Sequence, residues 1–220
     1  MPLTSEWTTD TANVTSTVSV QHHTSTPLDG NRSVRFNITT GGGGGSKGAG
    51  AVFLVTPTYV RGHVMGRLQT LMRVDSDVTL AGIYFLASQA TGIAGAGSAY
   101  MFGPGGALNT LKLQKTSGGL FAASPTTLHT IPVNVGASDP TDTFALEVEW
   151  KADLNIFGGT SIICRYGVDL NNLADVLEYV DETSPLLASS AEGLFAFRSG
   201  TSVVGQAIFD DTSVYNIALS

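Results

Sequence analysis

The feature that most constrains the fold of this chain is a succession of short segments in which apolar and polar residues alternate. Neighbouring side chains of a strand point to opposite faces, so this alternation is typical of a half-buried β-strand and not of a helix. Val34–Ile38 and Phe144–Trp150 show it most clearly, with every second side chain apolar. Glycine, proline, asparagine and aspartate separate the segments and indicate turns.

This pattern predicts eleven strands. The spacing of Asn172–Tyr179 also fits a helix, but its second half alternates equally well and turn residues follow, so we predict a strand there. One helical turn around Leu170–Ala174 is left open. The predicted strands are Val14–Val20, Val34–Ile38, Ala51–Thr56, Arg67–Val74, Val78–Leu86, Leu108–Lys115, Phe144–Trp150, Ser161–Tyr166, Val176–Val180, Gly193–Arg198 and Gln206–Tyr215. Many short strands separated by turns favour an all-β sandwich or barrel.

The composition agrees with an all-β domain. Charged residues make up 13% of the chain, against about 25% in an average soluble domain, and the residues that favour helices are scarce. A hydrophobic content of 42% argues against intrinsic disorder. With 220 residues and neither an internal repeat nor a linker between two cores, we predict one domain over residues 14–220, preceded by an N-terminal arm over residues 1–13.

The charge distribution excludes a nucleic-acid-binding surface. The formal net charge is −7, and residues 111–220 hold 13 of the 18 acidic side chains. This is the wrong sign for contact with phosphates. The single cysteine, Cys164, excludes an intrachain disulfide, and its strand-like surroundings indicate a buried structural thiol. The N-terminal segment has neither a basic region nor an apolar core, so we expect no signal peptide, and we expect no membrane span.

Two motifs suggest enzyme chemistry, and the sequence favours a structural interpretation of both. Gly41–Gly45 is followed by Ser46 and Lys47, but a phosphate loop needs glycine directly before the lysine and a helix after it. Glu147 and Glu149 share one face of a predicted strand, and a glycosidase needs two carboxylates. Because the opposite face of that strand is apolar, we expect both glutamates to point outward into solvent, and we expect no catalytic residues.

No metal-binding motif is present. His22 and His23 are adjacent and would point to opposite faces of a strand, so they do not form a zinc site. A calcium ion is left open, at an unknown site, because pairs of aspartates occur where strands end. These pairs lie at Asp75/Asp77, Asp139/Asp142 and Asp210/Asp211. We expect no other cofactor.

Three aromatic residues are candidates for contact with a partner or a glycan. Tyr100 and Phe102 lie in the glycine-rich segment Gly92–Gly106, which we predict to be a long loop. There they would either dock into a partner or cover the domain's own sheet. Trp7 lies in the predicted N-terminal arm and is the third candidate.

Several segments resemble one family. Tyr100–Lys115 resembles an aromatic strand, a turn and an L-x-L-x-K strand, and Thr143–Tyr166 resembles a pair of central strands. Gly193–Gly200 followed by Ala207–Tyr215 is similar to the closing strands, and Val34–Phe36 and Asp181–Leu187 also fit. These features resemble the concanavalin A-like lectin/glucanase family in its laminin-G-like branch, over roughly residues 30–217.

The resemblance implies a two-sheet antiparallel β-sandwich of the jelly-roll type. Its family 16 glycosidase branch carries E-x-D-x-x-E, whereas this chain offers Glu147-Val-Glu149 without the middle aspartate. The resemblance therefore implies a binding or structural protein and not an enzyme. Fold alone does not decide function, because unrelated functions share one fold.

Three functions follow as hypotheses. The first is a non-enzymatic structural protein of a virus particle, such as a bacteriophage capsid-decoration or tail-associated protein, made in the host cytoplasm and located in the virion. Such a protein would bind capsid or tail proteins and copies of itself as a homo-oligomer. The alternative is a carbohydrate-binding, lectin-like module, and the third hypothesis is a glycosidase.

Overall fold

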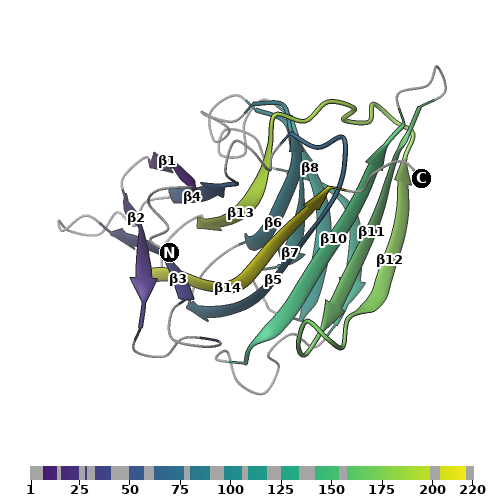
Figure 1. Ribbon diagram of the computed structural model, residues 1–220. Coiled ribbons are helices and arrows are strands. Elements are labelled where there is room, and N and C mark those ends of the chain that lie inside the picture. The colour runs from purple at the N-terminus through teal and green to yellow at the C-terminus, as the bar shows by residue number, and fades with distance from the viewer. Residues whose placement is uncertain are drawn as a thin grey trace.

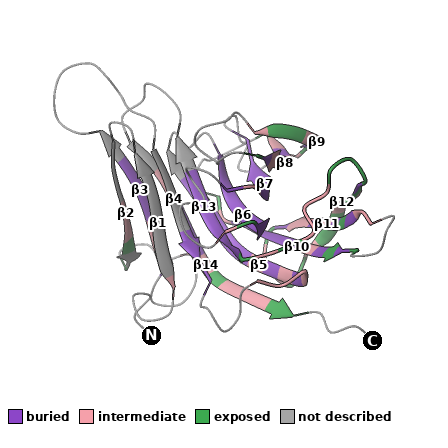
Figure 2. Ribbon diagram, turned by 90° about the horizontal axis from the view of Figure 1, so that it is seen from above, coloured by how far each residue is buried: buried purple, intermediate pink, exposed green. Residues whose placement is uncertain are grey.

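The fold is a sandwich of two antiparallel β-sheets. The computed structural model describes residues 7–13, 16–24, 28, 33–40, 50–56, 62–76, 80–89, 97–105, 109–117, 125–133, 142–153, 158–198 and 204–216. Across these ranges every regular element is a strand. In Figure 1, β5, β10, β11, β12 and β14 form the front layer, with β6, β7 and β8 behind them, and Figure 2 shows the same two layers from above.

The two sheets contain seven strands each. The first sheet has the order β1-β4-β13-β6-β7-β8-β9, and the second has the order β12-β11-β10-β5-β14-β3-β2. The strands of the first sheet are β1 (Thr8–Asn13), β4 (Gly50–Val55), β13 (Ala191–Arg198), β6 (Leu80–Ala87), β7 (Ala99–Pro104), β8 (Thr110–Thr116) and β9 (Thr126–Pro132). Those of the second are β12 (Ala174–Asp181), β11 (Thr160–Gly167), β10 (Phe144–Ala152), β5 (Met65–Ser76), β14 (Val204–Asn216), β3 (Ser33–Thr40) and β2 (Ser16–His23).

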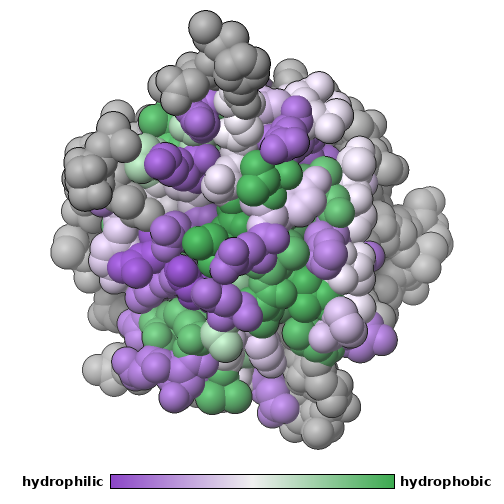
Figure 3. Space-filling view, turned by 90° about the vertical axis from the view of Figure 1, so that its right-hand side faces the viewer, coloured by the Kyte–Doolittle hydropathy of each residue, from purple (hydrophilic) through white to green (hydrophobic). Residues whose placement is uncertain are grey.

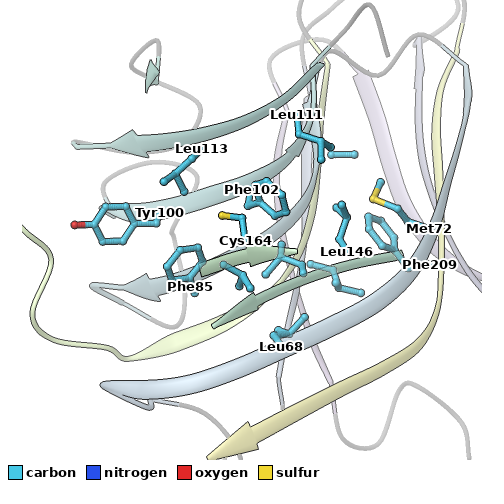
Figure 4. Close-up of a cluster of buried hydrophobic side chains, with 14 of the residues drawn as sticks. Leu68, Met72, Phe85, Tyr100, Phe102, Leu111, Leu113, Leu146, Cys164 and Phe209 are labelled. Atoms are coloured by element: carbon cyan, nitrogen blue, oxygen red, sulfur yellow. The ribbon is translucent and has the colours of Figure 1, made fainter. Parts of the chain in front are cut away.

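Alternate side chains from the two sheets fill the core between them. Phe85 of β6 stacks on Trp150 of β10, with ring centroids 5.2 Å apart, and on Tyr100 of β7 at 5.4 Å. Gly66 of β5 makes room for Trp150, because a Cβ atom added there would lie 2.6 Å from the indole ring. The buried aromatic and aliphatic side chains therefore come from both layers, as the close-up in Figure 4 shows.

All eleven predicted strands correspond to strands of the structure, and the segment Asn172–Tyr179 is confirmed as a strand, β12, after a turn. Three further strands were not predicted. Residues 99–104 of the expected loop form β7, which is buried along its whole length and so has no polar face to give an alternating pattern. Edge strand β9 is exposed on most of its residues and lacks an apolar stripe.

The expected N-terminal arm is corrected in part. Residues 8–13 form β1, which pairs in antiparallel register with β4, from Thr8 opposite Val55 to Asn13 opposite Gly50. This segment is therefore an edge strand of the domain. Its sequence, TTDTAN, carries a single apolar residue, so hydrophobic patterning could not reveal it. Residues 1–6 lie outside the described residues.

Candidate functional site on the outer face of the second sheet

The outer face of the second sheet carries polar and charged side chains on its central strands. Along β10, Leu146, Val148 and Trp150 belong to the core, so the residues between them, Glu147 and Glu149, point outward. The register places Glu147 between Gln69 of β5 and Arg165 of β11. The expectation that both glutamates point outward is confirmed, but Glu147 is only 4% exposed and is not a solvated surface group.

One guanidinium holds three carboxylates together on this face. Nη1 of Arg165 donates to Oε1 of Glu147 at 2.5 Å and to Oε2 of Glu149 at 3.1 Å. Its Nε donates to Oδ1 of Asp175 on β12 at 2.5 Å. Burial acts to lower the pKa of Arg165, but these three carboxylates outweigh it and hold the pKa above its ordinary value. Arg165 is therefore a permanent positive centre.

A register shift places Arg165 at this position. β11 and β12 pair as Cys164 opposite Leu177 and then as Arg165 opposite Asp175, so Val176 is the extra residue of a β-bulge. Bulges redirect side chains and are frequent beside functional sites. Without the extra residue, the partner of Arg165 would be Val176 and not an aspartate.

Arg67 and Tyr215 extend the polar face toward β14. Arg67 of β5 lies 3.7 Å from Oε2 of Glu147, and its guanidinium stacks over the Tyr215 ring at 4.4 Å. Tyr215 is 39% exposed, and it pairs with Arg67 in the sheet register. We name Arg165, Glu147, Glu149, Asp175, Arg67 and Tyr215 the Arg165 cluster. It combines charged groups and an accessible aromatic ring on one sheet face.

Amide side chains continue the polar surface over the outer strands. Nε2 of Gln206 on β14 donates to Oδ1 of Asn37 on β3 at 2.9 Å, and Nδ2 of Asn37 donates to Oε1 of Gln21 on β2 at 2.9 Å. Figure 3 views the molecule from the side on which β10, β11 and β12 lie in Figure 1, and hydrophilic residues gather there beside a hydrophobic area. Planar amides and carboxylates are suited to hydrogen bonding with hydroxyl groups.

Tyr100 and Phe102 do not lie on the surface. Both have an exposed fraction of 0%, and in Figure 4 their rings lie inside the core, which agrees with the alternative that they cover the domain's own sheet and not with an exposed contact. The Tyr100 hydroxyl donates to Oδ2 of Asp181 at 2.7 Å and accepts from the backbone N–H of Leu186 at 3.1 Å. Burial and the bond to Asp181 raise the pKa of Tyr100. The hydroxyl therefore joins the two sheets.

Lys115 completes this internal polar group. Its Nζ lies 2.5 Å from the same Asp181 oxygen and donates to the carbonyl oxygen of Thr183 at 3.0 Å. Burial acts to raise the pKa of Asp181, but Lys115 and the Tyr100 hydroxyl outweigh it and hold the pKa below its ordinary value. The group connects β7 and β8 of the first sheet to β12 of the second.

Trp7 directly precedes β1 in the chain. It lines a small pocket of about 150 Å³, packed partly against the core. The other lining residues come from both sheets and are Val34, Leu54, Leu194, Phe209, Asp210, Asp211 and Thr212. The pocket does not include any member of the Arg165 cluster, so the structure does not bring Trp7 together with the polar face.

The histidines and aspartates do not form a metal centre within the described parts of the chain. His63 contacts the fully buried Glu192, with Nδ1 2.9 Å from Oε1, and no group of three or more ligand-type side chains was found in those parts. Asp77, Asp139 and Gly41–Gly45 lie outside the described residues. A calcium site remains a prediction. Cys164 is buried, and burial raises the pKa of its thiol, which does not favour a nucleophilic role.

Sequence reasoning missed the Arg165 cluster because its members come from five strands. Glu147 and Glu149 were recognised as a pair, but Arg165, Asp175 and Tyr215 lie far from them in the chain. The available signal was one outward arginine in the strand that follows the two outward glutamates. Cross-strand pairing of opposite charges makes such an arginine a natural neighbour.

The fold is similar to that of solved glycan-degrading enzymes. The alginate lyase Aly36B is 14% identical, with a TM-score of 0.51, and the match covers 96% of this chain and 98% of the lyase. A structure of an endo-acting O-glycanase of the human gut microbiota that initiates mucin breakdown is 11% identical, with a TM-score of 0.56 and coverage of 99% and 95%. No family model and no curated protein matches the sequence.

These similarities bear on two expectations. The prediction that the chain is not an enzyme is contradicted, because two enzymes that act on glycans have this fold over almost their whole length. A virion role gains no support from them and stays a prediction. No helix long and apolar enough to span a membrane was found among the described residues. The chain is a two-sheet antiparallel β-sandwich of the jelly-roll type, the architecture that it shares with this lyase and this glycanase.

Proposed function

We propose that this chain is a glycan-binding domain whose binding surface is the Arg165 cluster on the outer face of the second sheet. The single observation that carries this proposal is the arrangement of Arg165 with Glu147, Glu149 and Asp175, beside the exposed ring of Tyr215. The similarity in fold to two glycan-degrading enzymes supports the class of ligand.

The chemistry of a sugar matches this surface. A pyranose presents hydroxyl groups around its rim and C–H groups on its faces, so it needs fixed acceptors and donors together with an apolar surface. The carboxylates are fixed by their bonds to Arg165, and Tyr215 supplies an aromatic ring that is 39% exposed. Side chains already held in place lose little conformational entropy on binding, which favours affinity.

Affinity electrophoresis in gels that contain a soluble polysaccharide tests the proposal. The panel contains laminarin, xyloglucan, hydroxyethylcellulose, galactomannan, alginate and chitosan. We expect at least one of them to retard the protein, and Tyr215→Ala to weaken the retardation about tenfold, because stacking contacts contribute about 1 kcal/mol or more. Val168→Ala is the matched control, since Val168 is 69% exposed and lies in the turn after β11.

The opposite results would overturn the proposal. If no polysaccharide of the panel, and no glycan of a printed glycan array, binds the wild-type protein, the domain is not a glycan-binding one. If the Tyr215→Ala and Val168→Ala proteins bind a glycan as tightly as the wild type, the binding surface lies elsewhere.

Cleavage of a glycosidic bond is a second candidate function, favoured by the carboxylate pair. One Nη1 atom bonds both Glu147 and Glu149, so the two carboxylates cannot lie further apart than the sum of the two hydrogen-bond distances. Retaining glycosidases place their carboxyl groups about 5–5.5 Å apart. Release of reducing ends from the polysaccharide that binds, and its loss in Glu149→Gln, would support cleavage. Binding without any release of reducing ends would reject it.

Location in a virus particle and assembly into a homo-oligomer stay predictions. They are compatible with a glycan-binding domain, since such a domain can be carried by a larger assembly. The mass of the purified chain in solution, measured by light scattering, tests the oligomer directly, and a monomer would reject it.

A further inference from the structure

We propose that the Arg165 cluster selects glycans that carry no acidic groups, an inference that rests on the proposed function. The inference concerns the class of sugar that this face accepts. It follows from how the two guanidinium groups of the cluster are occupied, and from which of the cluster's charges reach the solvent.

Both arginines of the cluster are already engaged by carboxylates of the protein. Arg165 bonds Glu147, Glu149 and Asp175, and Arg67 lies 3.7 Å from Glu147 while it stacks over Tyr215. Recognition of a uronate or a sulfate needs an arginine whose paired N–H groups can point at the ligand. Here Nε and Nη1 of Arg165 donate to carboxylates of the protein, and Nε of Arg67 lies next to Glu147.

Two of the three carboxylates of the cluster are more accessible than Arg165. The side chain of Asp175 is 52% exposed and that of Glu149 is 32% exposed, whereas that of Arg165 is 21% exposed. The side chain of the third carboxylate, Glu147, is 5% exposed, and that of Arg67 is 37% exposed. A ligand that approaches the sheet therefore meets Asp175 and Glu149 before it meets Arg165. Three carboxylates against two guanidiniums also leave an excess of one negative charge within the cluster.

The rest of the chain adds to this local excess. The whole protein carries a formal net charge of −7, and residues 111–220, which contain β10, β11 and β12, hold most of its acidic residues. A polyanionic glycan is therefore repelled at long range as well as at contact. A neutral glycan is repelled neither at long range nor at contact. Its hydroxyl groups can donate hydrogen bonds to the exposed carboxylates.

The expected size of the discrimination follows from Coulomb's law. A ligand carboxylate about 5 Å from Glu149 is repelled by it. At a partly screened protein surface, this repulsion corresponds to roughly a tenfold loss of affinity. This repulsion between exposed charges weakens as salt shortens the Debye length, from about 10 Å at 0.1 M to about 3 Å at 1 M. Discrimination that arises from charge must therefore shrink in high salt.

The test compares one polysaccharide backbone with and without acidic groups. The neutral polysaccharide of the panel that binds most tightly is carboxymethylated, and both forms are titrated by isothermal calorimetry at 0.05 M and 0.5 M NaCl. We expect the neutral form to bind about tenfold more tightly at low salt, and the difference to narrow at high salt. Tighter binding of the acidic form, or a difference that salt does not change, would overturn the inference.

Neutral isosteres of the two exposed carboxylates identify the residues responsible. In the double variant Glu149→Gln/Asp175→Asn, affinity for the carboxymethylated form should rise several-fold, because repulsion is lost and Arg165 becomes available. Glu182→Gln removes the same type of charge from an exposed residue just after β12 and is the control. Equal behaviour of the double variant and the control would reject the assignment, and circular dichroism checks that each variant is folded.

The two proposals fail in different ways. If the protein binds no glycan at all, the proposed function is wrong and the question of selectivity does not arise. If it binds alginate or the carboxymethylated form at least as well as the neutral form, the proposed function stands and only the inferred selectivity is wrong.

Discussion

The indole ring of Trp150 stacks against the phenyl ring of Phe85 across the interface between the two sheets, with ring centroids 5.2 Å apart. Trp150 belongs to β10, whose outer face carries Glu147 and Glu149, and Phe85 belongs to β6 of the opposite sheet. The strand that presents the candidate site is thus fixed from behind by the core. The core therefore supports the outward residues of β10 rigidly. A binding surface on a sheet requires such support.

Replacement of Phe85 by alanine should destabilise the whole domain. The side chain is fully buried between Trp150 and Tyr100, so its loss leaves a cavity in the centre of the core. We expect the free energy of unfolding to fall by about 3–5 kcal/mol, measured by urea denaturation. A change below about 1 kcal/mol would show that the aromatic stack does not support the core.

Substitution of Gly66 by alanine should be unfavourable although the added group is small. A Cβ atom at this position would lie 2.6 Å from Cζ2 of Trp150, and this ring is held in the core by Phe85. We expect a loss of about 1–3 kcal/mol from overpacking, with a change in the intrinsic fluorescence of Trp150. Unchanged stability and fluorescence would mean that the ring can move aside at no cost.

The hydroxyl of Tyr100 should contribute to stability through its two hydrogen bonds. Tyr100→Phe removes the donor to Asp181 and the acceptor for Leu186, while the ring stays in place. We expect a loss of about 1–2 kcal/mol in the free energy of unfolding. Tyr215→Phe is the control, because Tyr215 is partly exposed and should change stability by less than about 0.5 kcal/mol.

Stability should depend on pH through Glu192. This carboxyl is fully buried, and burial raises its pKa above the ordinary value of 4.5, although donors from Gly62 and His63 offset part of the effect. The folded state therefore keeps the proton to a higher pH than the unfolded state. The stability linked to this protonation is present below pH 4.5 and is lost as the pH rises through the folded-state pKa.

Comparison with Glu192→Gln isolates this contribution. The variant cannot ionise, so the stability of the wild type relative to the variant should decline as the pH rises from 4.5 toward neutrality. Urea denaturation at a series of pH values measures the difference. If the free energy of unfolding changes with pH in the same way in both proteins across this range, the prediction is wrong. A constant difference in stability caused by the amide does not affect this comparison.

The strands with one buried and one exposed face were predictable from the sequence, because apolar residues alternate with polar ones where one face of a strand is buried. Phe144–Trp150 alternates cleanly, and β10 occupies this segment with Leu146, Val148 and Trp150 in the core. β7 shows no such alternation, because both of its faces are buried. For that reason Tyr100 and Phe102 were placed in a loop, where contact with a partner and packing over the domain's own sheet were both left open, and the structure places their rings in the core.

Only part of the candidate site could be predicted from the sequence. The pair Glu147 and Glu149 followed from spacing along one strand, but their environment did not. Arg165 reaches them because β11 returns beside β10, and it reaches Asp175 because of the bulge at Cys164/Arg165. Neither the pairing register nor the position of a bulge is encoded in local composition.

The sequence by itself determined the class of fold, since hydrophobic alternation with a period of two residues allows only sheets that bury one face. It also determined that charge is sparse and mainly acidic. Only the tertiary structure decided which outward residues become neighbours. Contacts across a sheet join positions far apart in the chain, and their geometry depends on register, twist and bulges that arise when the two layers pack together.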